Sequence, residues 1–191
     1  MCHEILRDAR LYALLLKYDE DLAAEARAAG CECGGVLHVG NYPRKSRGGP
    51  SDLGAEHDRR LSFCCNRDGC RSRVTPPSVR FLGRRVYLGA VVVLVSVMLN
   101  GPTPRRVAKL AALIGASRRT LQRWRTWWRT AFAESAFWKA AAGRLATPVA
   151  GRFLPQSLLE RFGGDERDRL VAMLRFLSPI TTTSARNAMA W

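Results

Sequence analysis

The spacing of apolar residues along the chain predicts a mainly helical protein. Leucines recur on one side of residues 4–29, which indicates a helix that ends at Gly30. The apolar run LGAVVVLVSVML (88–99) is shorter than the roughly twenty residues that a membrane span requires, so we expect a buried core helix over about 86–99. Shorter helical patterns follow near 134–143, 155–162 and 165–177.

Residues 31–75 have a different composition, in which cysteine, glycine, proline and serine become frequent. A polar loop (45–56) separates two strand-like pieces, VLHVGNY (36–42) and RRLSFCC (59–65), and this arrangement predicts a β-hairpin. The prolines of 75–78 would then form a stiff extended linker, because each proline restricts its own backbone and that of the residue before it.

Residues 103–128, TPRRVAKLAALIGASRRTLQRWRTWW, have the pattern of two short helices that meet at a sharp turn. Thr103 is expected to cap the first helix, Gly115 to supply the positive φ of the turn and Ser117 to cap the second helix. The small or apolar residues of both helices would face inward; these are Leu110, Ala111, Ile114, Ala116, Leu121 and Trp124. The spacing predicts a helix-turn-helix whose recognition helix spans about 117–128.

The outward face of this hairpin carries arginines in place of apolar residues. Arg125 and Arg129 suit contacts to backbone phosphates, and Arg105 and Arg106 would clamp the backbone at the start of the preceding helix. The residues expected to meet DNA bases are Arg118, Arg119, Gln122, Arg123 and Thr126, with Ser117 at the start of the same helix. An ordinary helical hairpin is the alternative, but it would not usually present so many unpaired arginines.

The charge distribution supports a polyanionic partner. The chain carries 31 Lys and Arg against 16 Asp and Glu, a formal charge of +15. No acidic residue occurs from Gly69 to Ala133, a stretch that contains thirteen Lys and Arg residues. Arginine pairs bidentately with phosphate or with guanine, which favours nucleic acid, although coding bias in a GC-rich genome would also raise the arginine content.

The cysteines have a spacing that suits one structural zinc ion held across the hairpin. The expected ligands form two thiolate pairs; these are Cys31, Cys33, Cys65 and Cys70. Gly34-Gly35 and Gly69 would let backbone amides turn towards the sulfurs. Cys64 competes with Cys65, His38 could replace a member of the first pair, and a set of free buried thiols is the remaining alternative.

These features together resemble the zinc-ribbon and helix-turn-helix DNA-binding portions of bacterial insertion-sequence transposases and of small uncharacterised proteins carried with mobile elements. The resemblance covers about 31–130 and includes the basic loop YPRKSRGG (42–49) and the motif SFCCNRDGCRSR (62–73). It implies that the cysteines hold zinc and that the outward residues of 117–128 contact an element end or an operator. Such transposases continue into a nuclease domain with paired acids, whereas this chain has five acids after Ala133, all within expected helices.

We therefore expect a non-catalytic, sequence-specific double-stranded DNA-binding protein, either a transposition accessory factor or a transcriptional regulator. The zinc ribbon would orient the basic loop on phosphates or in an adjacent minor groove through Arg44, Lys45 and Arg47, and a solvated loop without DNA contact is the alternative. One alternative is the DNA-binding subunit of a truncated or split transposase, which would need a separate recombinase or transposase partner; another is an RNA-binding zinc-ribbon protein. The N-terminal sequence lacks a signal-peptide pattern, so a bacterial cytoplasmic, nucleoid-associated protein is expected, and homodimerisation would extend its DNA site.

The expected architecture is thus mainly α, with a small β zinc-ribbon-like hairpin and a helix-turn-helix core. The segments are an N-terminal helical segment (1–30), the ribbon-like module (31–75), the helix-turn-helix domain (79–133), C-terminal helices (134–177) and a tail expected to be disordered (178–191).

Overall fold

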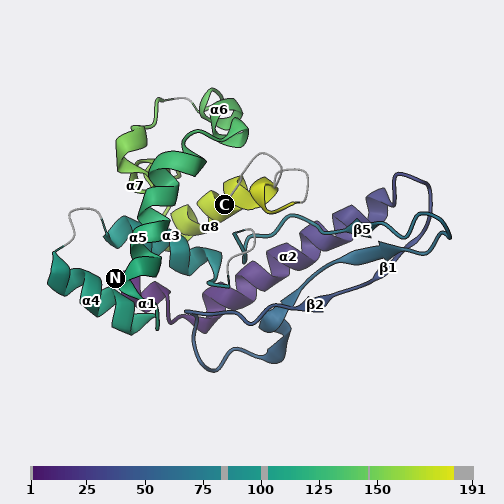
Figure 1. Ribbon diagram of the computed structural model, residues 1–191, viewed down its shortest axis with the longest axis horizontal. Coiled ribbons are helices and arrows are strands. Elements are labelled where there is room, and N and C mark those ends of the chain that lie inside the picture. The colour runs from purple at the N-terminus through teal and green to yellow at the C-terminus, as the bar shows by residue number, and fades with distance from the viewer. Residues whose placement is uncertain (1, 83–85, 100–102, 146, 183–191) are drawn as a thin grey trace.

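The computed structural model describes residues 2–82, 86–99, 103–145 and 147–182. It is mainly helical with a small antiparallel sheet, as the apolar pattern predicts (Figure 1). The elements up to the end of the sheet are α1 (Cys2–Ile5), α2 (Ala9–Ala29), β1 (Leu37–Val39), β2 (Tyr42–Pro43), the 3₁₀ helix η1 (Ala55–Asp58), β3 (Arg59–Arg60), β4 (Phe63–Cys65) and β5 (Arg73–Val74). The later elements are α3 (Gly89–Met98), α4 (Pro104–Leu113), α5 (Arg118–Trp127), the π-helix η2 (Trp128–Phe132), α6 (Ala136–Ala142), the 3₁₀ helix η3 (Gly151–Phe153), α7 (Gln156–Leu159), α8 (Glu166–Leu177) and the 3₁₀ helix η4 (Ser178–Thr181).

Helix α2 lies along the small sheet and joins it to the other helices (Figure 1). Its 21 residues correspond to a length of about 31 Å. The first half buries Leu11, Tyr12 and Leu15 in the large helical core, whereas Ala23 packs in a second, smaller cluster around the cysteines. The expected single helix over 4–29 is interrupted, because the Asp8 side chain accepts a hydrogen bond from the backbone of Arg10 and starts α2 as a separate element.

The predicted β-hairpin is confirmed, and its two arms pair at two separate places along their length. Strand β1 pairs antiparallel with β4, with Leu37 opposite Cys65, and further along the hairpin β2 pairs with β3, with Tyr42 opposite Arg60. Strand β5, which the sequence pattern did not indicate, adds to the free edge of β4.

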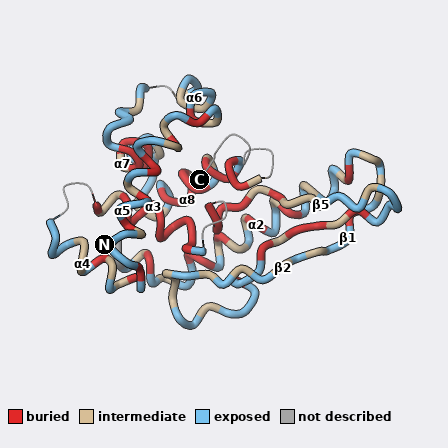
Figure 2. The backbone as a smooth tube through the Cα atoms, in the orientation of Figure 1, coloured by how far each residue is buried: buried red, intermediate tan, exposed pale blue. Residues whose placement is uncertain are grey.

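The apolar run after Leu88 forms α3, which is buried on all sides from Gly89 to Ser96. It packs against α5 and α8, and Figure 2 shows buried residues concentrated where these helices meet. A helix that is hydrophobic all round must be enclosed by other elements, so α3 is the central helix of the core.

No helix within the described residues is long and apolar enough to cross a membrane.

The proline-containing segment after β5 leads into the core. Ser78, Val79 and Phe81 are fully buried, and the backbone N–H of Ser78 donates to Thr181 Oγ1 at 2.9 Å. Ordered structure therefore continues through η4 and past the expected boundary at 178, because this hydrogen bond and the burial of Ile180 attach the end of α8 to the segment before α3. The rest of the expected tail, 183–191, lies outside the described residues.

A fully buried ion pair joins α2 to the segment before α3. Arg80 Nε lies 2.8 Å from Asp19 Oδ2, and both side chains are 0% exposed. Asp19 also accepts hydrogen bonds from Ser78 Oγ and the backbone N–H of Val79. The remaining nitrogens of the Arg80 guanidinium donate to backbone carbonyls at the end of η1 and the start of β3, including that of Arg59 at 2.9 Å. One side-chain pair thus connects α2, the hairpin and the segment that precedes α3.

The replacement Asp19→Asn is predicted to be strongly destabilising, because it leaves the Arg80 guanidinium buried without a counter-ion. We expect the free energy of unfolding, measured by urea denaturation, to fall by about 3 to 5 kcal/mol. Asp21→Asn makes the same change in the same helix at a side chain that is 53% exposed and paired with Lys17, so its cost should stay below about 1 kcal/mol. Similar unfolding midpoints for the two variants would contradict the assigned role of the buried pair.

Candidate nucleic-acid interface and metal centre

Helices α4 and α5 form a hairpin with the caps that the sequence predicts. Thr103 Oγ1 accepts from the backbone N–H of Arg106, and Pro104 occupies the first turn. Gly115 has φ +60°, a conformation that other residues rarely adopt, and Ser117 Oγ accepts from the backbone N–H of Thr120 at 3.1 Å. The turn and the start of α5 are therefore set by local hydrogen bonds.

The inner face of this hairpin is packed against α3 and the residues just before it. The buried members are Leu110, Ile114, Ala116, Leu121 and Trp124, and Ala111 is half-buried. Tyr87 packs edge-on against Trp124, with ring centroids 5.0 Å apart, and its hydroxyl donates to the carbonyl of Gly115 at 3.2 Å. Tyr87 thus contacts both the turn and α5, a role that its position in the sequence did not indicate.

The outer face of the hairpin is basic and exposed. The exposed residues are Arg105, Arg106, Ser117, Arg118, Arg119, Gln122, Arg123, Thr126 and Arg129. Neither α4 nor α5 contains an acidic residue, so no carboxylate of either helix pairs with these guanidinium groups. Arg125 differs from the others, because it is half-buried and its Nε is enclosed by protein atoms without a hydrogen-bond partner among the described residues.

The predicted basic loop is anchored by hydrogen bonds that Ser46 donates. Ser46 donates from its backbone N–H to Asp58 Oδ1 at 2.9 Å and from its hydroxyl to the carbonyl of His57 at 3.0 Å. Lys45 and Arg47 are exposed, whereas Arg44 is half-buried with its guanidinium over the Phe81 ring, 5.8 Å from the centroid.

The same loop reaches the helical hairpin through one residue. The backbone of Arg47 pairs with the strand-like segment 86–88, donating to the carbonyl of Val86 and accepting from the N–H of Leu88. The middle residue of that segment is Tyr87, which contacts the α4–α5 turn at Gly115. The exposed cations of the loop and of the hairpin therefore belong to one connected part of the fold.

The four expected cysteine ligands lie together. The Sγ atoms of Cys31, Cys33, Cys65 and Cys70 are all within 4.8 Å of one another, and the close pairs are 3.5 to 3.7 Å apart. Four sulfurs placed tetrahedrally about an ion at roughly 2.3 Å would be separated by about 3.8 Å. The cysteines form no disulfide, so this cluster can hold a metal ion.

The surrounding backbone is arranged to stabilise thiolates. The N–H of Gly35 donates to Cys33 Sγ and that of Arg67 donates to Cys65 Sγ, each at 3.4 Å. Gly34 and Gly69 have φ near +80°, as the expected turn of the backbone around the sulfurs requires. Ser72, two residues after Cys70, was not anticipated; its hydroxyl lies 2.8 Å from Cys70 Sγ and 3.6 Å from Cys31 Sγ.

The thiols of the cluster differ in their pKa values. Hydrogen bonding from the Ser72 hydroxyl lowers the pKa of Cys70 to about 6. The Arg67 amide favours the thiolate of Cys65, but burial and the adjacent thiols outweigh it and raise the pKa of Cys65 to about 12. Sulfurs this close cannot all carry a negative charge without a cation between them, and a bound divalent metal would supply that charge.

The alternative ligands of the sequence analysis lie outside the cluster. Cys64 and His38 are opposite each other in the β1–β4 register, and His38 is exposed. Side chains alternate across a strand, so Cys64 points away from the face that Cys65 presents to Cys31. Cys64 Sγ lies against Gly40 instead, within 2.8 Å of where a Cβ atom would be.

Comparison with protein-family models, with curated proteins and with solved structures finds no match to this chain.

The adjacent cysteines provide a matched test of the metal centre. Protein purified under reducing conditions should bind about one equivalent of Zn²⁺ per chain, measured by elemental analysis after desalting. Cys65→Ser should lose this stoichiometric binding, whereas Cys64→Ser should retain it, because only Cys65 faces the other three sulfurs. Retention of a full equivalent of zinc by Cys65→Ser would exclude Cys65 as a ligand.

Proposed function

We propose that this protein binds double-stranded DNA sequence-specifically through a helix-turn-helix formed by α4 and α5, without catalytic activity of its own. The observation that carries this proposal is the division of α5 into two faces. Its inner face is held in the core by Leu121 and Trp124, while its outer face presents arginines and Gln122 to solvent. An exposed helix of this kind fits the major groove of B-form DNA, where each base pair presents a distinct pattern of donors and acceptors.

The two kinds of contact would come from different places on the hairpin. Arg119, Gln122 and Arg123 lie along the exposed face of α5 and suit base edges, since arginine pairs with guanine and glutamine with adenine. Arg105 and Arg106 lie in the first turn of α4, where backbone N–H groups and the helix dipole also favour a phosphate. The phosphate contacts would orient the protein, and the base contacts would select the sequence.

We also propose that the metal is a structural Zn²⁺ ion. Four thiolates in tetrahedral arrangement are typical of structural zinc, and all four ligands come from the protein, so no coordination position is left for a substrate. The cysteine end of the hairpin has only a small apolar cluster of its own, built on Leu37 and Phe63, and a metal would supply the missing stabilisation.

The biological role that fits this arrangement is a transposition accessory factor or a transcriptional regulator. A four-cysteine ribbon that precedes a helix-turn-helix resembles the DNA-binding portions of transposases. This resemblance supports the proposed role. A split transposase would use the same surface but would act together with a separate catalytic chain.

The base-contacting residues are tested by selecting bound duplexes from a random pool at physiological salt. We expect the wild-type protein to enrich a defined site. The double variant Arg119→Ala with Gln122→Ala should lose preference at two or more positions of that site, by about 1 to 3 kcal/mol per contact.

The control is Arg105→Ala with Arg106→Ala, which removes two expected phosphate contacts. This variant should weaken binding to selected and unrelated duplexes alike and should reduce the salt dependence, while the selected sequence stays the same. A double variant at 119 and 122 that selects the wild-type site would exclude these residues from base contact. Binding to single-stranded RNA in preference to all duplexes would overturn the proposed function.

A further inference from the structure

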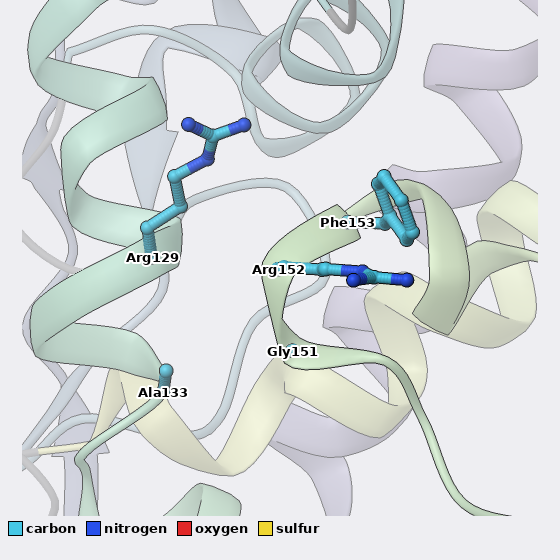
Figure 3. Close-up of a pocket in the computed structure, with 5 residues that line it drawn as sticks. All are labelled: Arg129, Ala133, Gly151, Arg152 and Phe153. Carbon is cyan, nitrogen blue, oxygen red and sulfur yellow. The ribbon is translucent and has the colours of Figure 1, made fainter.

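An open hollow lies just beyond the C-terminal end of α5. It has a volume of about 480 Å³ and lies between η2 and η3 (Figure 3). These two elements are about twenty residues apart in the chain. The described residues that line it are Arg129, Ala133, Gly151, Arg152 and Phe153. None of them is acidic, and only Arg129 among them was expected to contact a phosphate.

The side chains of the hollow combine positive charge with an aromatic surface. Arg129 projects from η2 on one side, and Arg152 runs alongside the Phe153 ring on the other (Figure 3). The Arg152 guanidinium lies 4.8 Å from the centroid of that ring. Phe153 is 48% exposed, which is unusual for a large apolar side chain in this protein. Ala133 and Gly151 have small or no side chains, so neither fills the hollow.

One wall of the hollow belongs to the helical element that continues α5. Helix η2 begins at Trp128, directly after α5 ends at Trp127, and both junction residues have right-handed helical backbone angles. Arg129 therefore lies about one turn beyond Arg125 and Thr126 on an extended helical element. If DNA lies along α5, the strand that leaves the proposed major-groove contact would pass over the hollow.

We propose that this hollow binds a phosphate and the adjoining deoxyribose of the DNA backbone, next to the bases that α5 contacts. The inference rests on the proposed function. Arg129 and Arg152 supply guanidinium groups for the phosphate oxygens, and the exposed ring of Phe153 supplies an apolar surface for the sugar.

The test compares four forms of the full chain on the duplex that the wild-type protein selects. Ethylation interference identifies the phosphates that the protein requires, and binding at several salt concentrations counts the released ions. Arg152→Ala should lose interference at a phosphate at one edge of the site and should lower the slope of log K against log[salt] by about 0.9. Phe153→Ala should weaken binding to the same duplex without changing that slope. Base preference should be unchanged in both variants.

Arg144→Ala is the matched control, since Arg144 is an exposed arginine that does not line the hollow. It should retain the wild-type interference pattern and salt slope. An Arg152→Ala protein with the wild-type pattern, or an equal loss of slope in Arg144→Ala, would overturn the proposed phosphate site while leaving the proposed function intact. Failure of the wild-type protein to select any duplex would overturn both.

Discussion

The buried pair between Asp19 and Arg80 is the interaction on which the assembly of this fold depends. Removing two charges from water costs several kcal/mol for each ion, and this cost is offset only when their hydrogen-bonding groups are satisfied. Here the carboxylate accepts from Ser78 and Val79 as well as from Arg80, and the guanidinium also donates to the carbonyls of η1 and β3. Together these contacts join three segments of the chain. The hairpin, α2 and the entry to α3 are therefore held by one buried polar network.

This network also reduces the part of the net positive charge that is available to a partner. Arg80 belongs to the stretch without acids, yet its charge is neutralised inside the protein and is not available to a partner. Arg60 is also buried and donates to the carbonyl of Pro76, and burial lowers its pKa. Arg73 donates to Gly40 and Ser62 within the hairpin. Within the described part of the stretch from Gly69 to Ala133, most of the exposed cations therefore lie on α4 and α5.

The metal centre and the basic loop occupy different ends of the hairpin. Cys31 follows the C-terminal end of α2, whereas Gly49, the last residue of the basic loop, lies near Tyr12 at the beginning of the same helix. A metal at the cysteines would therefore stabilise the far end of the hairpin and would not position the loop directly. The loop is positioned by η1 and by the pairing of Arg47 with the segment around Tyr87. This arrangement fits a structural ion better than one that takes part in binding.

The sequence by itself determined the features that depend on neighbouring residues. Thr103 and Ser117 cap the helices they were expected to cap, since a cap needs only a side chain and an N–H two or three residues away. Only the tertiary structure decided between Cys64 and Cys65, because strand register determines which of two adjacent side chains faces Cys31. The same holds for the burial of Arg80, for the bond from Ser78 to Thr181 and for the hollow between η2 and η3. These features join residues that are distant in the chain, and no local pattern of apolar and polar positions encodes such pairs.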